Sequence, residues 1–467
     1  MQSCIDSHKH MAQSNTIDML HGPLLKKILV FAMPLAASSI LQQLFNSTDV
    51  AVVGQFSSHQ ALAAVGSNGP IINLIVSLLI GLSVGSNVVI ANNIGAGNKA
   101  GVKRAAGTTM VVAAAGGLLM MIVGQFLARP MLELVDTPPD VIDLATLYLR
   151  ILFCGMPLVT VYNFGAAILR SKGDTRRPLY ILLLAGFINT GLNLVFVIVL
   201  HMSVAGVAIA TVIANAVSAL LVVRLLLHEE EPFRLRPGEL GIDMGELKRI
   251  MRIGLPAGLQ GMVFSISNVC LLSAINGFGS VASAGSAACL NFEMYSYFLI
   301  NCCGAAATTF VGQNYAAGKL DRCRRVFAIC MGLSVASCGL GVAIFTWQSG
   351  PCLSIFSTDR AVIAYGVTRM HWVLAWQWLA SSYEIAGACM RGMGHSTQPA
   401  LLTVFGTCIL RLVWVFAVSP HYHDFGILLA AYPISWVITG TMVIWAYVVV
   451  ARKARKRLTA SPQALDK

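Results

Sequence analysis

The chain has 467 residues, of which 56% are hydrophobic and only 11% are charged, and its formal net charge is +12. Soluble domains carry about 25% charged residues, so a chain this poor in charge cannot cover its surface against water. The mean hydropathy of +0.73 agrees with that view. The composition excludes an ordinary soluble domain and indicates a surface that faces lipid, so we expect membrane lipid as a partner.

The positive charge does not indicate a nucleic-acid partner. Lys and Arg stand in short clusters between apolar segments rather than on one face of a folded domain. The 12 cysteines form no CxxC pair and sit mostly inside apolar segments, so we interpret them as small apolar fillers. We therefore expect neither a metal site nor a disulfide framework, although a sodium site of unknown position is possible.

Apolar stretches of membrane-spanning length follow one another from end to end. The first set of predicted helices is 28–54, 64–91, 106–128, 144–168, 179–200 and 204–227. The second set is 253–276, 284–311, 326–348, 364–388, 400–418 and 426–450. The fold class we predict is an all-α polytopic membrane protein of about 12 transmembrane helices.

A polar linker divides the chain. We expect a cytoplasmic tail over 1–24, an N-terminal six-helix bundle over 25–227, a cytoplasmic linker over 228–250, a C-terminal six-helix bundle over 251–450 and a basic cytoplasmic tail over 451–467. The tail before about His21 has no apolar core with a small-residue cleavage site, so it does not read as a signal peptide.

The second half repeats the first at a shift of about 221 residues. Pro34 falls on Pro256, Asn46 on Asn268 and Pro178 on Pro399, and the loop 92–97 falls on 313–318. Because six spans are an even number, both halves enter the membrane the same way round. We predict two parallel repeats around a central cleft, the usual geometry of alternating access.

The orientation follows from the basic residues. With the N-terminus inside, the inner loops receive nearly all Lys and Arg, whereas the outer loops receive little beyond Arg129 and Arg360. This bias predicts a multi-pass protein of the plasma (inner) membrane with both termini cytoplasmic. We expect a monomer.

Two loop motifs resemble those of a known family. The stretch from Phe310 to Lys319, the matching stretch from Asn93 to Lys99, and the Arg- and Gly-rich stretches that end at Pro178 and Pro399 are similar to those of the multidrug and toxic compound extrusion (MATE) family. The resemblance covers roughly residues 25–450. It implies a cation-coupled antiporter that expels amphipathic, often cationic, organic small molecules. Lipid flippases share this fold, and a flippase for a lipid-linked substrate is the alternative.

Ionisable residues at membrane depth are costly and are functional candidates by default. The candidates for cation coupling are Asp49, Glu293 and Glu384, and Arg411 is a further buried charge. Gln42, Asn46 and Asp49 share one face of a helix at i, i+4 and i+7. For Gln42 and Asn46, hydrogen bonds that hold neighbouring helices together are an adequate explanation. The MATE resemblance also implies a coupling Asp in the first helix, after a proline such as Pro34.

Further polar residues could complete a substrate or cation pocket. These are Tyr162, Asn163, Asn189, Asn193, Asn215 and Asn268, with Thr211 and Ser218 beside them. Many members of the family that the chain resembles carry a second Asp at the position of Asn193, so a two-carboxylate proton site in this half is in doubt.

In the second half, Gln377, Ser381 and Glu384 recur at i, i+4 and i+7. Three tryptophans near Gln377 offer an aromatic wall for an organic cation, or serve as interfacial anchors. We predict that Arg411 holds Glu384 charged, either as a fixed staple or as a switch.

The chain contains no motif for an enzyme. It has no helix-borne HExxH, GxSxG elbow, Walker A loop or paired-Cys zinc signature. His421, His423 and Asp424 fit a solvated turn after Pro420. Without a Walker A loop there is no sign of a built-in ATPase. We expect no cofactor, and a proton or sodium gradient as the energy source.

Overall fold

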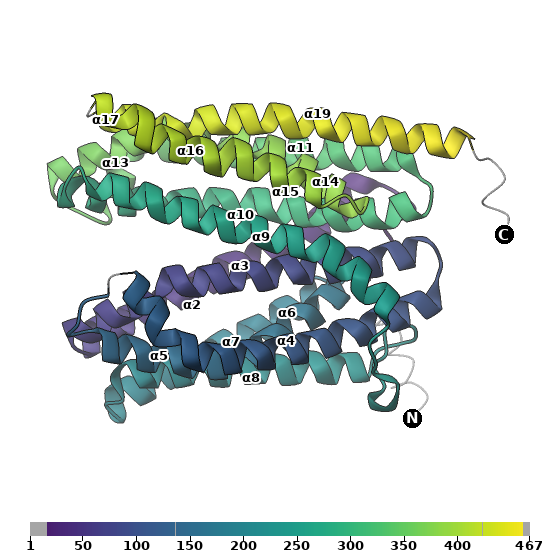
Figure 1. Ribbon diagram of the computed structural model, residues 1–467, viewed down its shortest axis with the longest axis horizontal. Coiled ribbons are helices and arrows are strands. Elements are labelled where there is room, and N and C mark those ends of the chain that lie inside the picture. The colour runs from purple at the N-terminus through teal and green to yellow at the C-terminus, as the bar shows by residue number, and fades with distance from the viewer. Residues whose placement is uncertain (1–15, 136, 423, 461–467) are drawn as a thin grey trace. The chain divides into compact units, whose positions relative to one another are not determined.

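The computed structural model describes residues 16–135, 137–422 and 424–460, and within these ranges every regular element is a helix (Figure 1). The first half contains α2 (Leu24–Phe56), α3 (His59–Gly95), α4 (Lys99–Leu134), α5 (Ile142–Cys154), α6 (Met156–Ser171), α7 (Arg176–Leu194), the π-helical η1 (Val195–Val199) and α8 (Ser203–Leu227). The all-helical fold class is confirmed.

The second half follows a short 3₁₀ turn, η2 (Pro237–Glu239). It contains α9 (Met244–Asn276), α10 (Ser280–Ala316), α11 (Leu320–Trp347), α12 (Ser349–Ser354), α13 (Arg360–Trp372), η3 (Leu374–Leu379), α14 (Ala380–Gly392), α15 (Thr397–Thr403), η4 (Val404–Ile409), α16 (Leu410–Val413), η5 (Trp414–Val418), α17 (Ser419–Tyr422), α18 (Phe425–Leu429) and α19 (Ala431–Ala460). Of these, η3 is a 3₁₀ helix, and η4 and η5 are π-helical.

Ten helical spans in the described residues are long and apolar enough to cross a membrane, and the bent pair α5 and α6 makes an eleventh. The pair bends by 47° at Gly155 and Pro157. Proline has no N–H for the helical ladder and its ring clashes with the preceding turn, which accounts for the break.

The remaining predicted helix, 364–388, is not continuous. The chain there forms α13, then the 3₁₀ turn η3, then α14. No proline or glycine lies between Val367 and Leu379. The sequence pattern therefore gave no signal for this break.

The chain divides into two compact units, and two helices belong to both. Among the described residues, the first unit comprises 16–18 and Met33–Gly254, and the second comprises Met19–Ala32 and 255–460. Both divisions inside a helix fall next to a proline, Pro34 in α2 and Pro256 in α9. The first turns of α2 thus pack in the second unit, and the first turns of α9 pack in the first unit.

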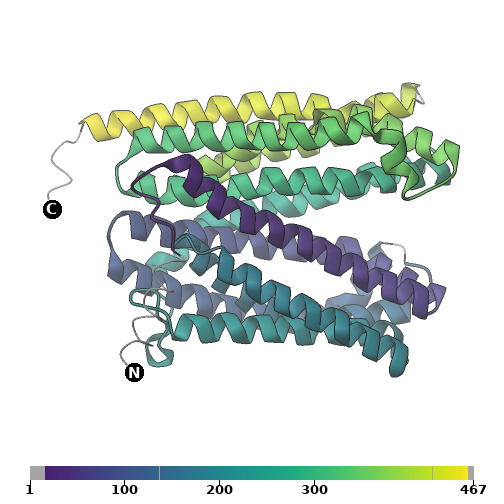
Figure 2. The ribbon, with the colours of Figure 1, turned by 180° about the vertical axis from the view of Figure 1, so that it is seen from behind.

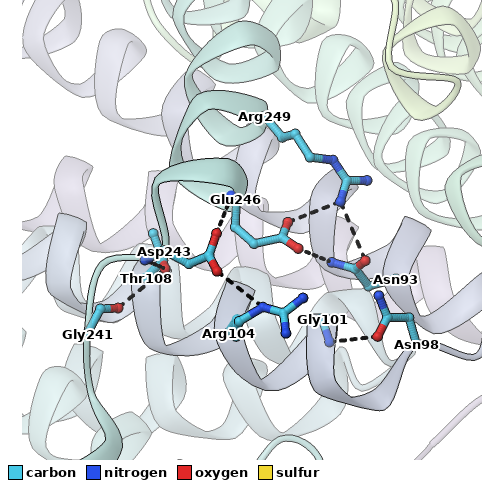
Figure 3. Close-up of polar contacts among 9 residues, drawn as sticks. All are labelled: Asn93, Asn98, Gly101, Arg104, Thr108, Gly241, Asp243, Glu246 and Arg249. Atoms are coloured by element: carbon cyan, nitrogen blue, oxygen red, sulfur yellow. Dashed lines mark hydrogen bonds and ion pairs between the residues drawn. The ribbon is translucent and has the colours of Figure 1, made fainter.

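A cluster of polar residues, which we call the linker clasp, fixes the start of α9 to the first unit (Figure 3). Asn93 at the end of α3 donates to Glu246 at 3.3 Å and accepts from Arg249 at 3.5 Å. Asp243 caps the first turn of α9 through the Glu246 N–H at 2.9 Å, and pairs with Arg104 of α4 at 3.2 Å. Glu246 is buried, so the clasp is part of the packed first unit.

A matching cluster, the N-terminal clasp, fixes the segment before α2 to the second unit; Figure 2 shows this part of the chain in dark purple. Asn314 at the end of α10 donates to the Met19 carbonyl oxygen at 3.1 Å and accepts from Arg322 at 3.0 Å. Lys319 and Arg322 also donate to the carbonyl oxygens of Leu20 and Gly22, at 3.1 and 3.2 Å. Asn93 and Asn314 occupy the same place in the two loop motifs.

Candidate functional site

Asp49 is buried on α2, whereas Gln42 and Asn46 on the same helix are exposed in the structure. Asp49 is covered because α7 approaches α2 closely. At Gly186 of α7, an added Cβ would lie only 1.8 Å from the ring of Phe45. A small residue at this point lets two helices come close together.

Asp49 of α2 and three polar side chains from α7 and α8 form a closed ring of hydrogen bonds, which we call the Asp49 ring. The Asn193 amide donates to one Asp49 carboxylate oxygen, and to the Asn189 side-chain oxygen at 3.3 Å. Asn189 donates to the Thr211 hydroxyl at 3.3 Å, and that hydroxyl lies 3.5 Å from the other Asp49 oxygen. The structure thus brings together Asp49, Asn189, Asn193 and Thr211, each a candidate from the sequence.

The second Asp49 oxygen is poorly satisfied. A hydroxyl has one hydrogen to donate, and Thr211 has a shorter contact, 2.9 Å, with the Val207 carbonyl oxygen. The side-chain oxygen of Asn193 is also buried without a hydrogen-bond partner. Two oxygens of the ring can therefore accept a proton donor or coordinate a cation.

The ring contains one carboxyl group and no basic side chain. No Lys or Arg among the described residues forms an ion pair with Asp49. A buried carboxylate is costly unless a cation or a proton neutralises it. The chemistry available to this ring is reversible binding of a small cation.

The other predicted residues of this half lie outside the ring. Tyr162 donates to the Pro178 carbonyl oxygen at 3.2 Å, which ties α6 to α7, and Asn163 donates to Val159 within its own helix at 2.8 Å. Asn215 is half-buried. These hydrogen bonds give Tyr162 and Asn163 structural roles in the conformation described here.

In the second half, Glu293 of α10 forms a bidentate ion pair with Arg369 of α13, at 2.6 and 2.9 Å. Both side chains are buried. Gln377 of η3 donates to the Glu293 backbone oxygen at 2.9 Å, and the Cys289 thiol lies 3.5 Å from its carboxylate. Glu293 is thus neutralised by the protein, unlike Asp49.

The predicted pairing of Glu384 with Arg411 is wrong for this conformation. Glu384 accepts from the Tyr297 hydroxyl at 3.3 Å and lies 3.8 Å from Arg391. Arg391 follows Glu384 by seven residues, two turns along the same face of α14, and a long Arg side chain can reach back over that distance. Arg391 is thus a nearer partner for Glu384 than the predicted Arg411.

Arg411 lies elsewhere in the second unit. Its Nε donates to the Ser435 hydroxyl at 2.9 Å, and its guanidinium lies over the Tyr432 ring at 4.4 Å. The aromatic residues around Arg411 are not the tryptophans predicted to form an aromatic wall near Gln377. Two of those tryptophans, Trp372 and Trp376, are exposed. Asn268 is half-buried on α9.

Sequence reasoning missed Arg369 and Tyr297. Arg369 lies near the start of the predicted helix 364–388, and in the structure it is only 3% exposed. The signal available was a charge inside an apolar segment that also contains Glu384. Tyr297 lies on α10 one turn beyond Glu293, on the same face.

Comparison with known proteins agrees with the predicted duplication, which is confirmed. The MatE family model matches the chain twice, over residues 34–195 and 256–416. The probable multidrug resistance protein YoeA of Bacillus subtilis (strain 168) is 27% identical over 438 residues, covering 92% of this chain and 94% of the relative. The FAD transporter of Shewanella oneidensis is 22% identical over 351 residues, covering 74% of this chain and 77% of the relative.

Solved structures share the fold. One example is a multidrug resistance MATE family transporter of the MOP superfamily in an outward-facing conformation. It matches with a TM-score of 0.87 at 21% identity, and the match covers 94% of this chain and 98% of the other.

Proposed function

The chain belongs to the MatE family of multi-pass membrane transporters, and on that basis we propose that it is a secondary active antiporter. It exports amphipathic, often cationic, organic compounds such as drugs and toxins in exchange for protons or sodium. The support is the twofold family match and the relatives, 26–27% identical, that are named as probable multidrug resistance proteins. Relatives are not uniform, because one is named as an FAD transporter.

The observation that carries the coupling proposal is the Asp49 ring. The Asp49 carboxylate is buried, and its hydrogen-bond donors are all neutral. One of its two oxygens has only a long contact, 3.5 Å, with the Thr211 hydroxyl. A proton or a sodium ion would neutralise the carboxylate. When the ion leaves, the ring is left with an unpaired charge, which favours rearrangement of α2 against α7 and α8.

The energy of an ion gradient is sufficient for such a cycle. One elementary charge that moves through 100 mV supplies about 2.3 kcal/mol. That energy corresponds to an about fifty-fold concentration ratio of the exported compound.

Alternating access would use the two helices that belong to both units. α2 and α9 each change unit next to a proline, and each is anchored at its start by a clasp. A proline removes one hydrogen bond of the helical ladder, so a bend there costs less than elsewhere. We infer that Pro34 and Pro256 are the bending points.

We further propose that the protein lies in the plasma (inner) membrane as a monomer, with both termini and the linker 228–250 in the cytoplasm and six-helix bundles over 25–227 and 251–450. The distribution of Lys and Arg supports this topology.

The test is dye transport by purified protein in vesicles, with pH and sodium gradients imposed separately. Ethidium, an organic cation, should move against its concentration gradient when one of the two gradients is imposed and should stop when that gradient is collapsed. Movement of a fluorescent lipid between leaflets, with no gradient-driven ethidium transport, would instead favour the alternative, a flippase for a lipid-linked substrate.

A further inference from the structure

Arg411 is the largest fully buried side chain in the described part of the protein, with 1% of its surface exposed. It lies on α16, a single turn between the π-helical segments η4 and η5. π-Helical turns inside α-helices occur frequently at functional sites. Figure 1 shows α16 beneath α19, the helix on which it packs.

The charge of Arg411 is not neutralised. Among the described residues no carboxylate lies within ion-pair distance of it. Nε donates to Ser435 at 2.9 Å, but Nη2 is buried and has no hydrogen-bond partner. A guanidinium presents a planar fork of N–H groups that suits an anion with two or three oxygens.

Aromatic rings enclose this guanidinium on several sides. Its central carbon lies 4.4 Å from the ring centre of Tyr432, 5.6 Å from Trp436 and 5.8 Å from Phe264. Ring faces attract a cation, but they do not cancel its charge, and they accept an N–H only weakly compared with an anionic oxygen. The same rings can stack against the apolar part of an aromatic ligand.

The charged residues near Arg411 do not neutralise its positive charge. Arg369 lies on the Tyr432 ring as well, at 5.4 Å, but it is paired with Glu293 through both of its bonds. The buried set of Arg369, Arg411 and Glu293 therefore carries one positive charge more than negative. The Asp49 ring of the other unit has the opposite imbalance.

We propose that Arg411 and the rings of Tyr432, Trp436 and Phe264 form a subsite for the anionic group of an amphipathic aromatic substrate. The ligand class is an organic carboxylate, sulfonate or phosphate with an aromatic body, and zwitterionic compounds belong to it. The guanidinium binds the anion through charge-assisted hydrogen bonds, and Ser435 holds its orientation. This inference extends the substrate class of the proposed transporter and rests on that function.

Two dyes with the same xanthene skeleton and opposite charge test it. Fluorescein is an anion at neutral pH and rhodamine 123 is a cation. Binding of each dye to the purified full-length protein in detergent is measured by fluorescence anisotropy, for the wild type, Arg411→Gln and Arg411→Lys. We expect fluorescein binding to weaken at least about tenfold in Arg411→Gln, the effect of losing one charge-assisted hydrogen bond, while rhodamine 123 binding changes less than about twofold.

Arg411→Lys keeps the charge and so protects the fold if the Gln variant does not express. Because Lys lacks the fork, fluorescein binding should weaken several-fold and rhodamine 123 binding should stay unchanged. The proposal is overturned if the wild type does not bind fluorescein, if either variant binds it as the wild type does, or if both dyes lose affinity together. Binding needs no ion gradient, so failure of gradient-driven ethidium transport would reject the antiporter proposal separately.

Discussion

Asn93 and Asn314 occupy matching positions in the two halves, and each holds the segment that leads into the first helix of the other half. Asn93 bonds to Glu246 in the first turn of α9, and Asn314 bonds to the Met19 carbonyl oxygen ahead of α2. The duplication thus produces an exchange of helix starts between the two compact units. This exchange explains why α2 and α9 each belong to both.

Asn93→Ala should release the linker. The substitution leaves the buried Glu246 without its amide donor, a loss of about 1–3 kcal/mol. A loss of about 1–2 kcal/mol already raises the fraction of molecules in which the linker is detached about 5–30-fold. Tryptic cleavage in the linker, at Arg234 or Arg249, should accelerate accordingly. Asn314→Ala is the matched control, because it weakens the other clasp; equal acceleration by both variants would contradict a local role for Asn93.

Gly186→Ala should disturb the Asp49 ring from a distance. The new Cβ would lie 1.8 Å from Phe45, so α7 must move away from α2 and the bond between Asn193 and Asp49 weakens. Overpacking of this kind costs about 1–3 kcal/mol. Thermal unfolding in detergent and ion-driven dye transport should both decline. Gly191→Ala, on the same helix with nothing within 4 Å, should leave both unchanged; a similar decline there would point to a general effect on α7.

Much of this architecture could be predicted from the sequence. The hydropathy pattern predicted the all-helical class, and the matching residues at a shift of about 221 predicted the two repeats. Both features depend on patterns along the chain. The MATE resemblance, carried by two loop motifs, is confirmed by the family match. Asp49, Asn189, Asn193 and Thr211 could be grouped in advance, since each is a polar residue on an apolar helix.

The rest depends on three-dimensional packing. The break between α13 and α14 has no proline or glycine to mark it, and the π-helical turns beside Arg411 shift its helix relative to an ideal register. An Arg side chain can reach about two turns along its own helix or across to a neighbouring helix. Spacing along the sequence therefore could not show which Arg pairs with which Glu. The structure pairs Glu293 with Arg369 and places Glu384 near Arg391.

Asp49→Asn should stop ion-driven efflux while the protein still folds. Asparagine keeps the shape of the side chain and can still hydrogen-bond to Asn193, but it has no charge for a coupling ion to neutralise. We expect transport in vesicles at the level of protein-free vesicles, with unchanged elution from size-exclusion chromatography. Asp140→Asn, an exposed change of the same kind, is the control. Wild-type efflux by Asp49→Asn would remove Asp49 from the mechanism.

The ion pair between Glu293 and Arg369 should contribute strongly to stability. Removal of one partner from a buried pair leaves an unpaired charge and costs about 3–5 kcal/mol. Glu293→Gln and Arg369→Gln should each lower the thermal unfolding temperature, and the double variant should lose less than the sum of the two. Glu231→Gln breaks an exposed pair with Arg236, where about 0–1 kcal/mol is expected. Additive losses at Glu293 and Arg369 would indicate that the pair is not coupled.

The proposed topology places the linker in the cytoplasm and the turn between α12 and α13 outside. Gly238 and Thr358 report on these two segments, because both are exposed and an added Cβ at Gly238 meets nothing within 4 Å. In intact cells, a membrane-impermeant maleimide should label Thr358→Cys strongly and Gly238→Cys only after the membrane is permeabilised. The parent chain, which keeps its native cysteines including the exposed Cys154, supplies the background.

Since the inner loops hold nearly all Lys and Arg, the reverse pattern would mean that charge does not set the orientation of this protein. Equal labelling of both positions in intact cells would mean that the linker and this turn share one side, which an odd number of spans between them forbids. Such a result would therefore challenge the assignment of α9, α10 and α11 as three complete crossings.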